Sequence, residues 1–379
     1  MKKYFFLAVA AVVALAACTK NEADTTSFEK AKVINFNTVA GKATKAPISG
    51  TTYSYDCPAF GVFASYLEKD KTWAANKATA TRYMDDVEVS FNDTKDIWAP
   101  ASTYYWPLEG SLSFIAYSPK AAATAAFAEA TGTLTLTGFT VESTVADQVD
   151  LLYSSVNADR TMNESYYVDG GNSKNSETAE GDKGVNIKFK HALAQIIFKA
   201  KTADEVFDAG MSFKINTITV NAASTADNMT VVNPADGDAA ATITTWTNPK
   251  TNADFAVRSE DFPNATVAAG AANFLGKTLS APIGDALLMI PVTAFAGTDP
   301  TVTVKYTLYR TSDALAMGSK TVTIHFDDID DVVTDWQAGK KYEYDLTIDL
   351  QKIYFNPTIT DWVDAEDPQP VDVPDDATI

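Results

Sequence analysis

Apolar and polar residues alternate along many short stretches of the chain. The alternation is clear in Gly132–Gly138, Met211–Val220, Thr301–Tyr309 and Lys340–Ile348. A period of two residues is typical of half-buried antiparallel strands, whose side chains point in turn to the core and to the solvent. Clusters of Gly, Asn, Asp and Pro separate these stretches, which predicts turns. We therefore expect an all-β protein.

Two segments depart from the alternation. Ala121–Ala130 is rich in alanine and predicts one short helix, whereas Val185–Phe198 is largely apolar and predicts a central strand with a kink. The chain has 379 residues, and a single core tends to split above roughly 250–300 residues. We therefore expect two tandem β-sandwich domains, residues 46–203 and residues 204–379, the second ending in an acidic tail.

The first residues predict export. Two lysines precede an apolar run, Phe5–Ala17, which fits the ~7–15 residues of a secretory signal and is shorter than the ~20 needed to span a bilayer. The run ends in Leu-Ala-Ala-Cys, which resembles a bacterial lipobox, so we expect residues 1–17 to be a lipoprotein signal peptide and Cys18 to carry the lipid. Two or more acyl chains there would tether the protein durably. An ordinary signal peptide followed by an incidental cysteine is the alternative.

The second cysteine and the linker agree with a tether. The chain has 2 cysteines, so a lipid on Cys18 leaves Cys57 as the second one, no intramolecular disulfide is then possible, and stability must come from burial. Thr19–Glu22 partly resembles a signal that sends lipoproteins to the outer face of the outer membrane. We expect residues 18–45 to be a tether and propeptide, and the protein to be an outer-membrane lipoprotein at the cell surface.

Composition sets limits on the partners. Hydrophobic residues make up 46% of the chain and aromatic residues 11%, which is enough for a large core and argues against disorder. The formal net charge is −19. Nucleic acids and anionic lipids bind basic surfaces, so neither is expected as a partner.

Residues that carry catalytic or metal chemistry are few. The chain has 2 histidines, and both His191 and His325 stand alone in predicted strands, where packing or a hydrogen bond is the expected role. A zinc site has no set of ligands to draw on. Asp327–Asp331 is acidic but lacks the spacing of a calcium loop and predicts a solvated turn. We expect no cofactor, no metal and no enzymatic activity.

Aromatic residues gather in two places of the first half. Clustered aromatic side chains in β-sandwiches usually belong to the core, and we expect this for most of the group. The alternative is a surface that stacks on sugar rings, which would make the protein a non-polymerising surface lipoprotein that binds glycans. The residues concerned are Trp73, Trp98, Tyr104, Tyr105 and Trp106.

An ordered set of segments resembles one known family, the fimbrillin-like (Mfa-like) family of type V pili. The resemblance runs from Phe28 to about Trp362. It implies a subunit exported as a lipoprotein and built from two transthyretin-like β-sandwich domains, with other fimbrial subunits as partners in a homo- or heteropolymer. The segments are Phe60–Ala64, Tyr83–Met84, Trp98, Tyr105–Pro107, Leu112–Pro119, Phe189–Phe198, Leu287–Val292 and Trp336–Leu346.

The resemblance also implies a processing site. Family members are cut after a basic residue that follows the first strand, and the matching bond here joins Lys45 to Ala46, although lysine replaces the usual arginine. Loss of the strand leaves an apolar groove between unpaired backbone groups, which an extended segment of the next subunit can fill. Such head-to-tail filling does not close, so it builds a fibre. The strand expected to be removed is Val33, Ile34, Asn35 and Phe36.

The end of the chain leaves the role of the subunit open. Asp364–Ile379 is acidic and contains prolines, which cannot donate to a β-ladder. Either the donor strand lies upstream, around Ile353–Val363, or the protein is a tip, accessory or anchor subunit. A solvated C-terminal extension is the remaining interpretation. The ligand of an adhesin, a glycan or protein on a host or bacterial surface, is not specified by the sequence.

Overall fold

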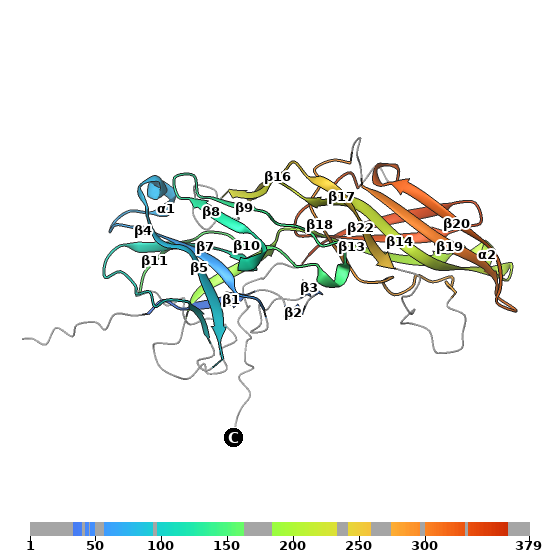
Figure 1. Cartoon of the computed structure of the whole chain (residues 1–379), viewed down its shortest axis with the longest axis horizontal. Coiled ribbons are helices and arrows are strands. Elements are labelled where there is room, and N and C mark those ends of the chain that lie inside the picture. The colour runs from blue at the N-terminus through green and yellow to red at the C-terminus, as the bar shows by residue number, and fades with distance from the viewer. Residues whose placement is uncertain are drawn as a thin grey trace, which may run out of the picture. The chain divides into compact units, whose positions relative to one another are not determined.

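The alternating stretches form strands of mainly antiparallel sheets (Figure 1). The computed structural model describes residues 33–39, 42–44, 46–49, 57–93, 97–162, 184–232, 242–258, 274–295, 300–329 and 333–362. Strands occupy all four of the predicted alternating stretches: β9 Thr133–Thr137, β14 Met211–Thr225, β19 Thr301–Arg310 and β21 Lys340–Ile348. The expectation of a β protein is confirmed. Cys18, Lys45 and the tail from residue 363 lie outside the described residues.

The first large sheet closes into a ring. Its order is β10-β12-β1-β6-β5-β4-β7-β11, and β10 also pairs with β7, so the strands from β10 to β7 close into a ring and β11, among the described strands, pairs with β7 alone. The bounds are β1 Phe36–Val39, β4 Phe60–Leu67, β5 Thr81–Asn92, β6 Ile97–Pro100, β7 Ser111–Ser118, β10 Leu152–Ser154, β11 Asn157–Arg160 and β12 Val185–His191.

Three four-stranded sheets and one hairpin complete the described strands. Their orders are β18-β13-β21-β22, β17-β14-β19-β20 and β16-β15-β9-β8, and β2 pairs with β3. The remaining bounds are β2 Lys42–Thr44, β3 Ala46–Ser49, β8 Thr124–Ala128, β13 Ala194–Thr202, β15 Asn228–Val232, β16 Thr242–Thr247, β17 Lys250–Arg258, β18 Leu287–Met289, β20 Leu315–His325 and β22 Ile353–Asp361. Two short helices, α1 Trp73–Asn76 and α2 Asp204–Asp208, connect strands.

The apolar stretch Val185–Phe198 is not one kinked strand, so that prediction is wrong. It holds β12, which belongs to the ring, and the start of β13, which belongs to a different sheet. Ala192 and Leu193 separate the two strands and are fully buried. The middle of the stretch, Ala192–Ala194, is apolar because the chain passes there from one sheet to another inside the core.

The predicted alanine-rich helix is also wrong. Within Ala121–Ala130 the structure has a 3₁₀ turn followed by β8, which pairs along its length with β9. Phe127 of β8 is buried against the larger core. The helix preference of alanine is below about 1 kcal/mol per residue, and a complete ladder with a buried aromatic side chain outweighs it.

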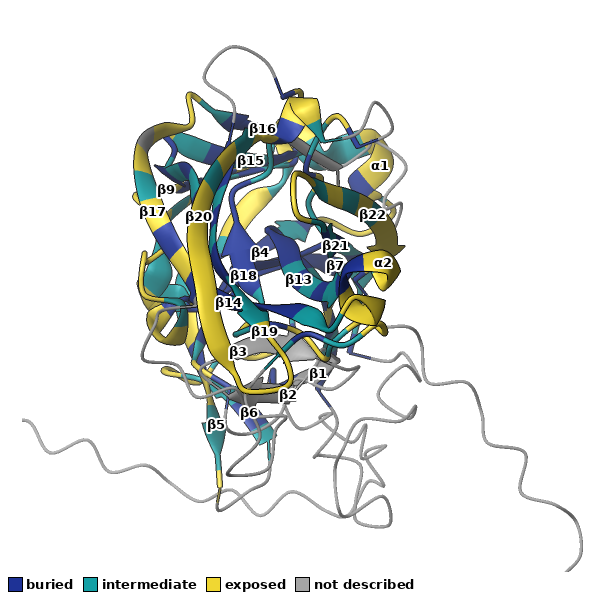
Figure 2. Cartoon of the chain, turned by 90° about the vertical axis from the view of Figure 1, so that its right-hand side faces the viewer, coloured by how far each residue is buried: buried dark blue, intermediate teal, exposed yellow. Residues whose placement is uncertain are grey.

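The buried side chains form two apolar cores. One fills the ring and includes Phe36, Phe60, Trp98 and Phe114, and we call it the ring core. The other and larger one continues from the outer face of the ring into the other sheets. The edge strand β20 contributes little to either core: Figure 2 shows it as exposed along most of its length. No helix in the described part of the chain is long and apolar enough to cross a membrane.

Candidate functional site

The first strand occupies a position between β6 and β12. Phe36 pairs with Trp98 of β6 in antiparallel register, and Phe36–Val39 pairs in parallel with Val185–Lys188 of β12. We call the position that β1 occupies the first-strand slot. Within the described ring, β1 is the connection between β6 and β12. Its removal would open the ring at this point and leave two strand edges with unpaired N–H and C=O groups.

The residues that precede β1 are held as extended chain. The backbone N–H of Ile34 donates to the carbonyl oxygen of Tyr104 at 2.9 Å, and the N–H of Val185 donates to the carbonyl oxygen of Asn35 at 2.7 Å. Val33 forms an isolated antiparallel bridge with Tyr105. The segment predicted as the first strand therefore lies in the sheet, although the regular ladder begins only at its last residue.

Two of the four residues in this segment anchor it. Ile34 is 0% exposed and Phe36 is 2% exposed, whereas the exposed fraction of Val33 is 42%. The ring of Phe36 contacts Phe60 and Phe114 edge to face, with centroid distances of 6.0 and 5.7 Å. Burial of each side chain of this size contributes about 1.5–3 kcal/mol to the free energy of unfolding. The slot thus selects an extended chain with large apolar residues at alternate positions.

A glycine forms the wall of the slot. A β-carbon added to Gly184 would lie 2.3 Å from the carbonyl carbon of Phe36 and 2.6 Å from its α-carbon. Any other residue at position 184 would therefore collide with the backbone of the first strand. Sequence reasoning missed Gly184; the available signal was its place directly before the strand that begins at Val185.

The aromatic residues mostly belong to the cores, as expected. Trp73, Trp98 and Trp106 are buried, Tyr104 is half-buried, and Tyr105 is 48% exposed. All 6 tryptophans of the chain lie among the described residues and are buried, so none offers an indole face to a sugar. The hydroxyl of Tyr83 donates to the carbonyl oxygen of Tyr105 at 2.5 Å, and burial raises the pKa of Tyr83.

The isolated histidines do not form a site together. His191 is buried and bonded to Asp150, whereas His325 is exposed at the end of β20. Asp327 and Asp328 are exposed in a short 3₁₀ turn, in keeping with a solvated acidic turn. The described residues contain no group of His, Cys, Asp and Glu side chains that is suited to a metal ion.

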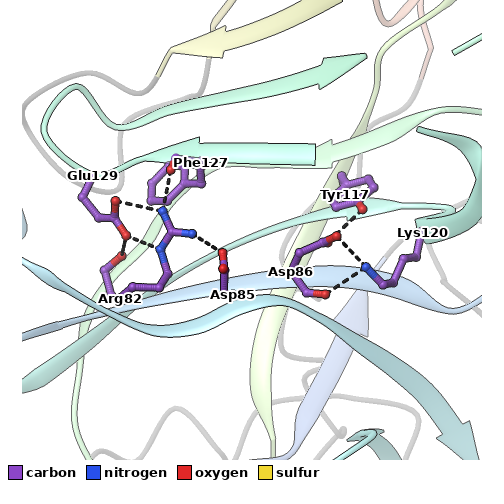
Figure 3. A network of polar contacts seen from close by, with 8 residues as sticks. Arg82, Asp85, Asp86, Tyr117, Lys120, Phe127 and Glu129 are labelled. Carbon is purple, nitrogen blue, oxygen red and sulfur yellow. Dashed lines mark hydrogen bonds and ion pairs between the residues drawn. The ribbon is translucent and has the colours of Figure 1, made fainter. Parts of the chain in front are cut away.

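A polar cluster that sequence reasoning missed surrounds a bulge in β5 (Figure 3). Arg82 donates hydrogen bonds to both carboxylate oxygens of Glu129, to Asp85 and to the carbonyl oxygen of Phe127. Its guanidinium carbon also lies 5.2 Å from the centroid of the Phe63 ring. Arg82 therefore clamps β5 to the end of β8, and its charge is satisfied within the protein.

On the other side of the bulge, the carboxylate of Asp86 is also paired with side chains of the protein. The backbone of Asp86 has a φ of 48°. Its carboxylate accepts a hydrogen bond of 2.8 Å from the hydroxyl of Tyr117 and forms an ion pair of 2.6 Å with Lys120. A β-carbon on Gly61 would lie 2.3 Å from the Tyr117 ring. Burial and the bond to Asp86 raise the pKa of Tyr117. Because cations of the chain itself pair with these carboxylates, the cluster is a structural clamp.

Replacing Arg82 with methionine should lower the free energy of unfolding at neutral pH by about 1–2 kcal/mol, because charge-assisted hydrogen bonds are lost. Burial raises the pKa of Glu129, but the bonds to Arg82 outweigh it and hold this pKa below its ordinary value of 4.5. The contribution is therefore complete above pH 4.5 and is lost as the pH falls through the lowered value. Urea titrations at several pH values should show the two proteins converge in acid.

The matched control for this prediction is Arg310→Met. Arg310 pairs with Asp313 on the surface, and exposed pairs contribute little to stability. This variant should unfold like the wild type. Equal stability of the Arg82 variant and the wild type at pH 7 would contradict the clamp.

Comparisons with known proteins find one matching family and a shared fold. A model of the fimbrillin-like family matches residues 44–362, most of the chain. A fimbrial protein from Bacteroides vulgatus has a TM-score of 0.56 to this structure at 19% sequence identity, covering 88% of this chain and 100% of that chain. No curated protein matches the chain.

Two further solved structures are less similar. A candidate cell adhesion protein from Bacteroides uniformis has a TM-score of 0.46 at 15% identity, over 87% of this chain and 98% of that one. The fimbrial anchor protein Mfa2 from Porphyromonas gingivalis has a TM-score of 0.28 at 10% identity, over 88% and 98%. The likeness to the Bacteroides vulgatus protein shows a shared fold, and the match of the family model over most of the chain shows that this protein belongs to the fimbrillin-like family.

Proposed function

We propose that the protein is a structural subunit or adhesin of a cell-surface fimbria and has no enzymatic activity. The observation that carries the proposal is the first-strand slot, where Ile34 and Phe36 complete a closed ring just ahead of the Lys45–Ala46 bond. The family supports a fimbrial role. The proposal includes two tandem transthyretin-like domains, residues 46–203 and 204–379.

The proposal also covers how the subunit is exported and made ready for assembly. Lipid on Cys18 tethers the new chain to the outer membrane, and a protease then cuts after Lys45. The cut separates Val33–Phe36 from the body, and loss of this segment opens the ring between β6 and β12. The subunit is thereby released from its lipid and exposes an acceptor for a strand of another copy.

The donor strand is β22. Its first residues, Ile353-Tyr354-Phe355-Asn356, repeat the pattern Ile34-Asn35-Phe36-Asn37 of the first strand. Ile353 and Phe355 are half-buried and pack on the larger core, as the alternate apolar residues of the first strand pack in the ring core. β22 is an edge strand of its sheet, so it can leave by breaking a single ladder. Insertion with Phe355 in the place of Phe36 satisfies the selectivity of the slot.

The proposed processing is tested by the intact mass and N-terminus of protein taken from the cell surface. Wild-type protein should begin at Ala46 and carry no lipid. Lys45→Ala should keep an acylated Cys18 and form no fibres, because the first strand stays in the slot. Lys42→Ala, three residues away, is the control and should be processed and assembled like the wild type.

Two outcomes would contradict parts of this proposal. Normal fibres from the Lys45→Ala variant would exclude this bond as the processing site. A wild-type chain that starts at acylated Cys18 and never polymerises would favour an anchor subunit or a glycan-binding lipoprotein. The burial of all 6 tryptophans argues against the glycan-binding alternative.

A further inference from the structure

We propose that Trp362 is a latch that holds β22 in its own sheet through a stack on His191, and that opening of this contact frees β22 for a second copy of the chain. The first half of the proposal concerns the single molecule. The second half rests on the proposed function of β22 as donor.

The strand β22 has little packing of its own. None of its nine residues is buried, and its outward side is exposed, as Figure 2 shows. It lies at the edge of its sheet and pairs only with β21 among the described strands. Trp362, the residue directly after the strand, is buried, with an exposed fraction of 6%. The ladder to β21, the partial packing of Ile353 and Phe355 on the larger core and the buried side chain of Trp362 therefore hold the strand.

The seat of the latch is a buried histidine on the ring. The indole of Trp362 stacks on the imidazole of His191 with a centroid distance of 3.6 Å and an angle of 6° between the planes. Nδ1 of His191 lies 2.8 Å from Oδ2 of Asp150, and both side chains are buried. The bond to Asp150 fixes the orientation of the imidazole ring, so the indole meets a flat surface that is already in place.

Hydrogen bonds hold the chain in place on both sides of the stack. The N–H of Trp362 donates to the carbonyl oxygen of Gly339 at 2.8 Å, and the N–H of Gly339 donates to Leu193 at 3.0 Å. The indole N–H of Trp246 donates to the carbonyl oxygen of Ala192 at 3.2 Å. The link between β12 and β13 is therefore held from two sides. The latch joins the end of β22 to β12, the same strand against which the first strand lies.

Other contacts near the end of β22 are too weak to replace the stack. Lys340 pairs with Asp361, but Asp361 is largely exposed, and exposed ion pairs contribute little. A stacked aromatic pair contributes beyond the area it buries, and an edge strand without buried residues opens locally at low cost. Loss of the indole should therefore affect β22 before it affects the rest of the protein.

Hydrogen exchange of the full chain tests the first half of the proposal. In Trp362→Ala the amides of β22 should exchange at least about tenfold faster than in the wild type, while those of β14 and β19 keep their rates. Trp362→Phe, which keeps a flat ring, should restore much of the protection. His191→Phe keeps a stacking surface and loses the bond to Asp150. The exchange rate of β22 in this variant should lie between the rates in Trp362→Phe and Trp362→Ala.

A buried residue away from the latch supplies the control. Val304 of β19 is fully buried, and Val304→Ala should raise exchange in β14, β19 and β22 together. Unchanged β22 exchange in Trp362→Ala, or a rise shared equally with β14 and β19, would overturn the latch.

The rate of fibre assembly distinguishes the latch formed by Trp362 from the role of β22 as donor. If both halves are correct, processed Trp362→Ala should assemble faster than the processed wild type. Faster exchange in β22 with an unchanged assembly rate would support the latch and overturn the role of β22 as donor. Faster assembly without faster exchange in β22 would overturn the latch.

Discussion

Replacing Gly184 with alanine should displace the first strand and lower the free energy of unfolding by about 3–5 kcal/mol. The new β-carbon would lie 2.3 Å from the carbonyl carbon of Phe36, and this neighbour is backbone, which cannot rotate away. Relief requires β1 to move, which withdraws Ile34 and Phe36 from the ring core. Denaturant titration measures the loss, and hydrogen exchange of residues 33–39 shows where it occurs.

A second strand glycine provides the control. Gly318 lies in β20, and a β-carbon there would meet no atom within 4 Å. Gly318→Ala should change stability by no more than about 0.5 kcal/mol. If Gly184→Ala keeps both wild-type stability and a protected first strand, the backbone of β1 does not pass against Gly184 and the geometry of the slot is wrong.

Phe36→Ala should lower the free energy of unfolding by about 3–4 kcal/mol, because it removes a buried ring and leaves a cavity between Phe60 and Phe114. The loss concerns the ring core, which also contains the buried thiol of Cys57. We expect a thiol reagent to label Cys57 faster in this variant, because the ring opens more often. Denaturant titration and the labelling rate are the two measurements.

The exposed residue at the start of the same segment is the matched control. Val33 is 42% exposed, so Val33→Ala should change stability by less than about 1 kcal/mol and should not change the labelling of Cys57. Equal effects of the two substitutions would mean that the segment is held by its backbone alone and that the slot has no side-chain selectivity.

The strands that the sequence predicted well are those with one covered face. In β14, β19 and β21 buried residues alternate with partly exposed ones, so the pattern of the sequence matches the pattern of burial. β7 is different, because all eight of its residues are buried. One side of the ring faces the ring core and the other faces the larger core, which removes the alternation that would mark the strand.

The site could be predicted only in part. Ile34 and Phe36 alternate with Asn35 and Asn37, so an anchored strand could be predicted from the local sequence. The pairing of β1 with β12 joins residues about 150 positions apart, and no local pattern reports such a contact. Gly184 and His191 have their roles only through segments distant in sequence, Phe36 in one case and Trp362 in the other. The structure was needed to find both.

The direction of the ladders around β1 has a mechanical consequence. The strand pairs with β12 over the whole of Phe36–Val39 and with β6 through Phe36 alone, and its axis runs along the ladder with β12. In a fibre joined through this slot, tension along the inserted strand would act in shear, so the load would spread over all the hydrogen bonds of the ladder with β12 at once. Peeling from one end would break the bonds one after another and need less force. A fimbria assembled in this way would resist traction along its length and yield to forces that pull a joint sideways.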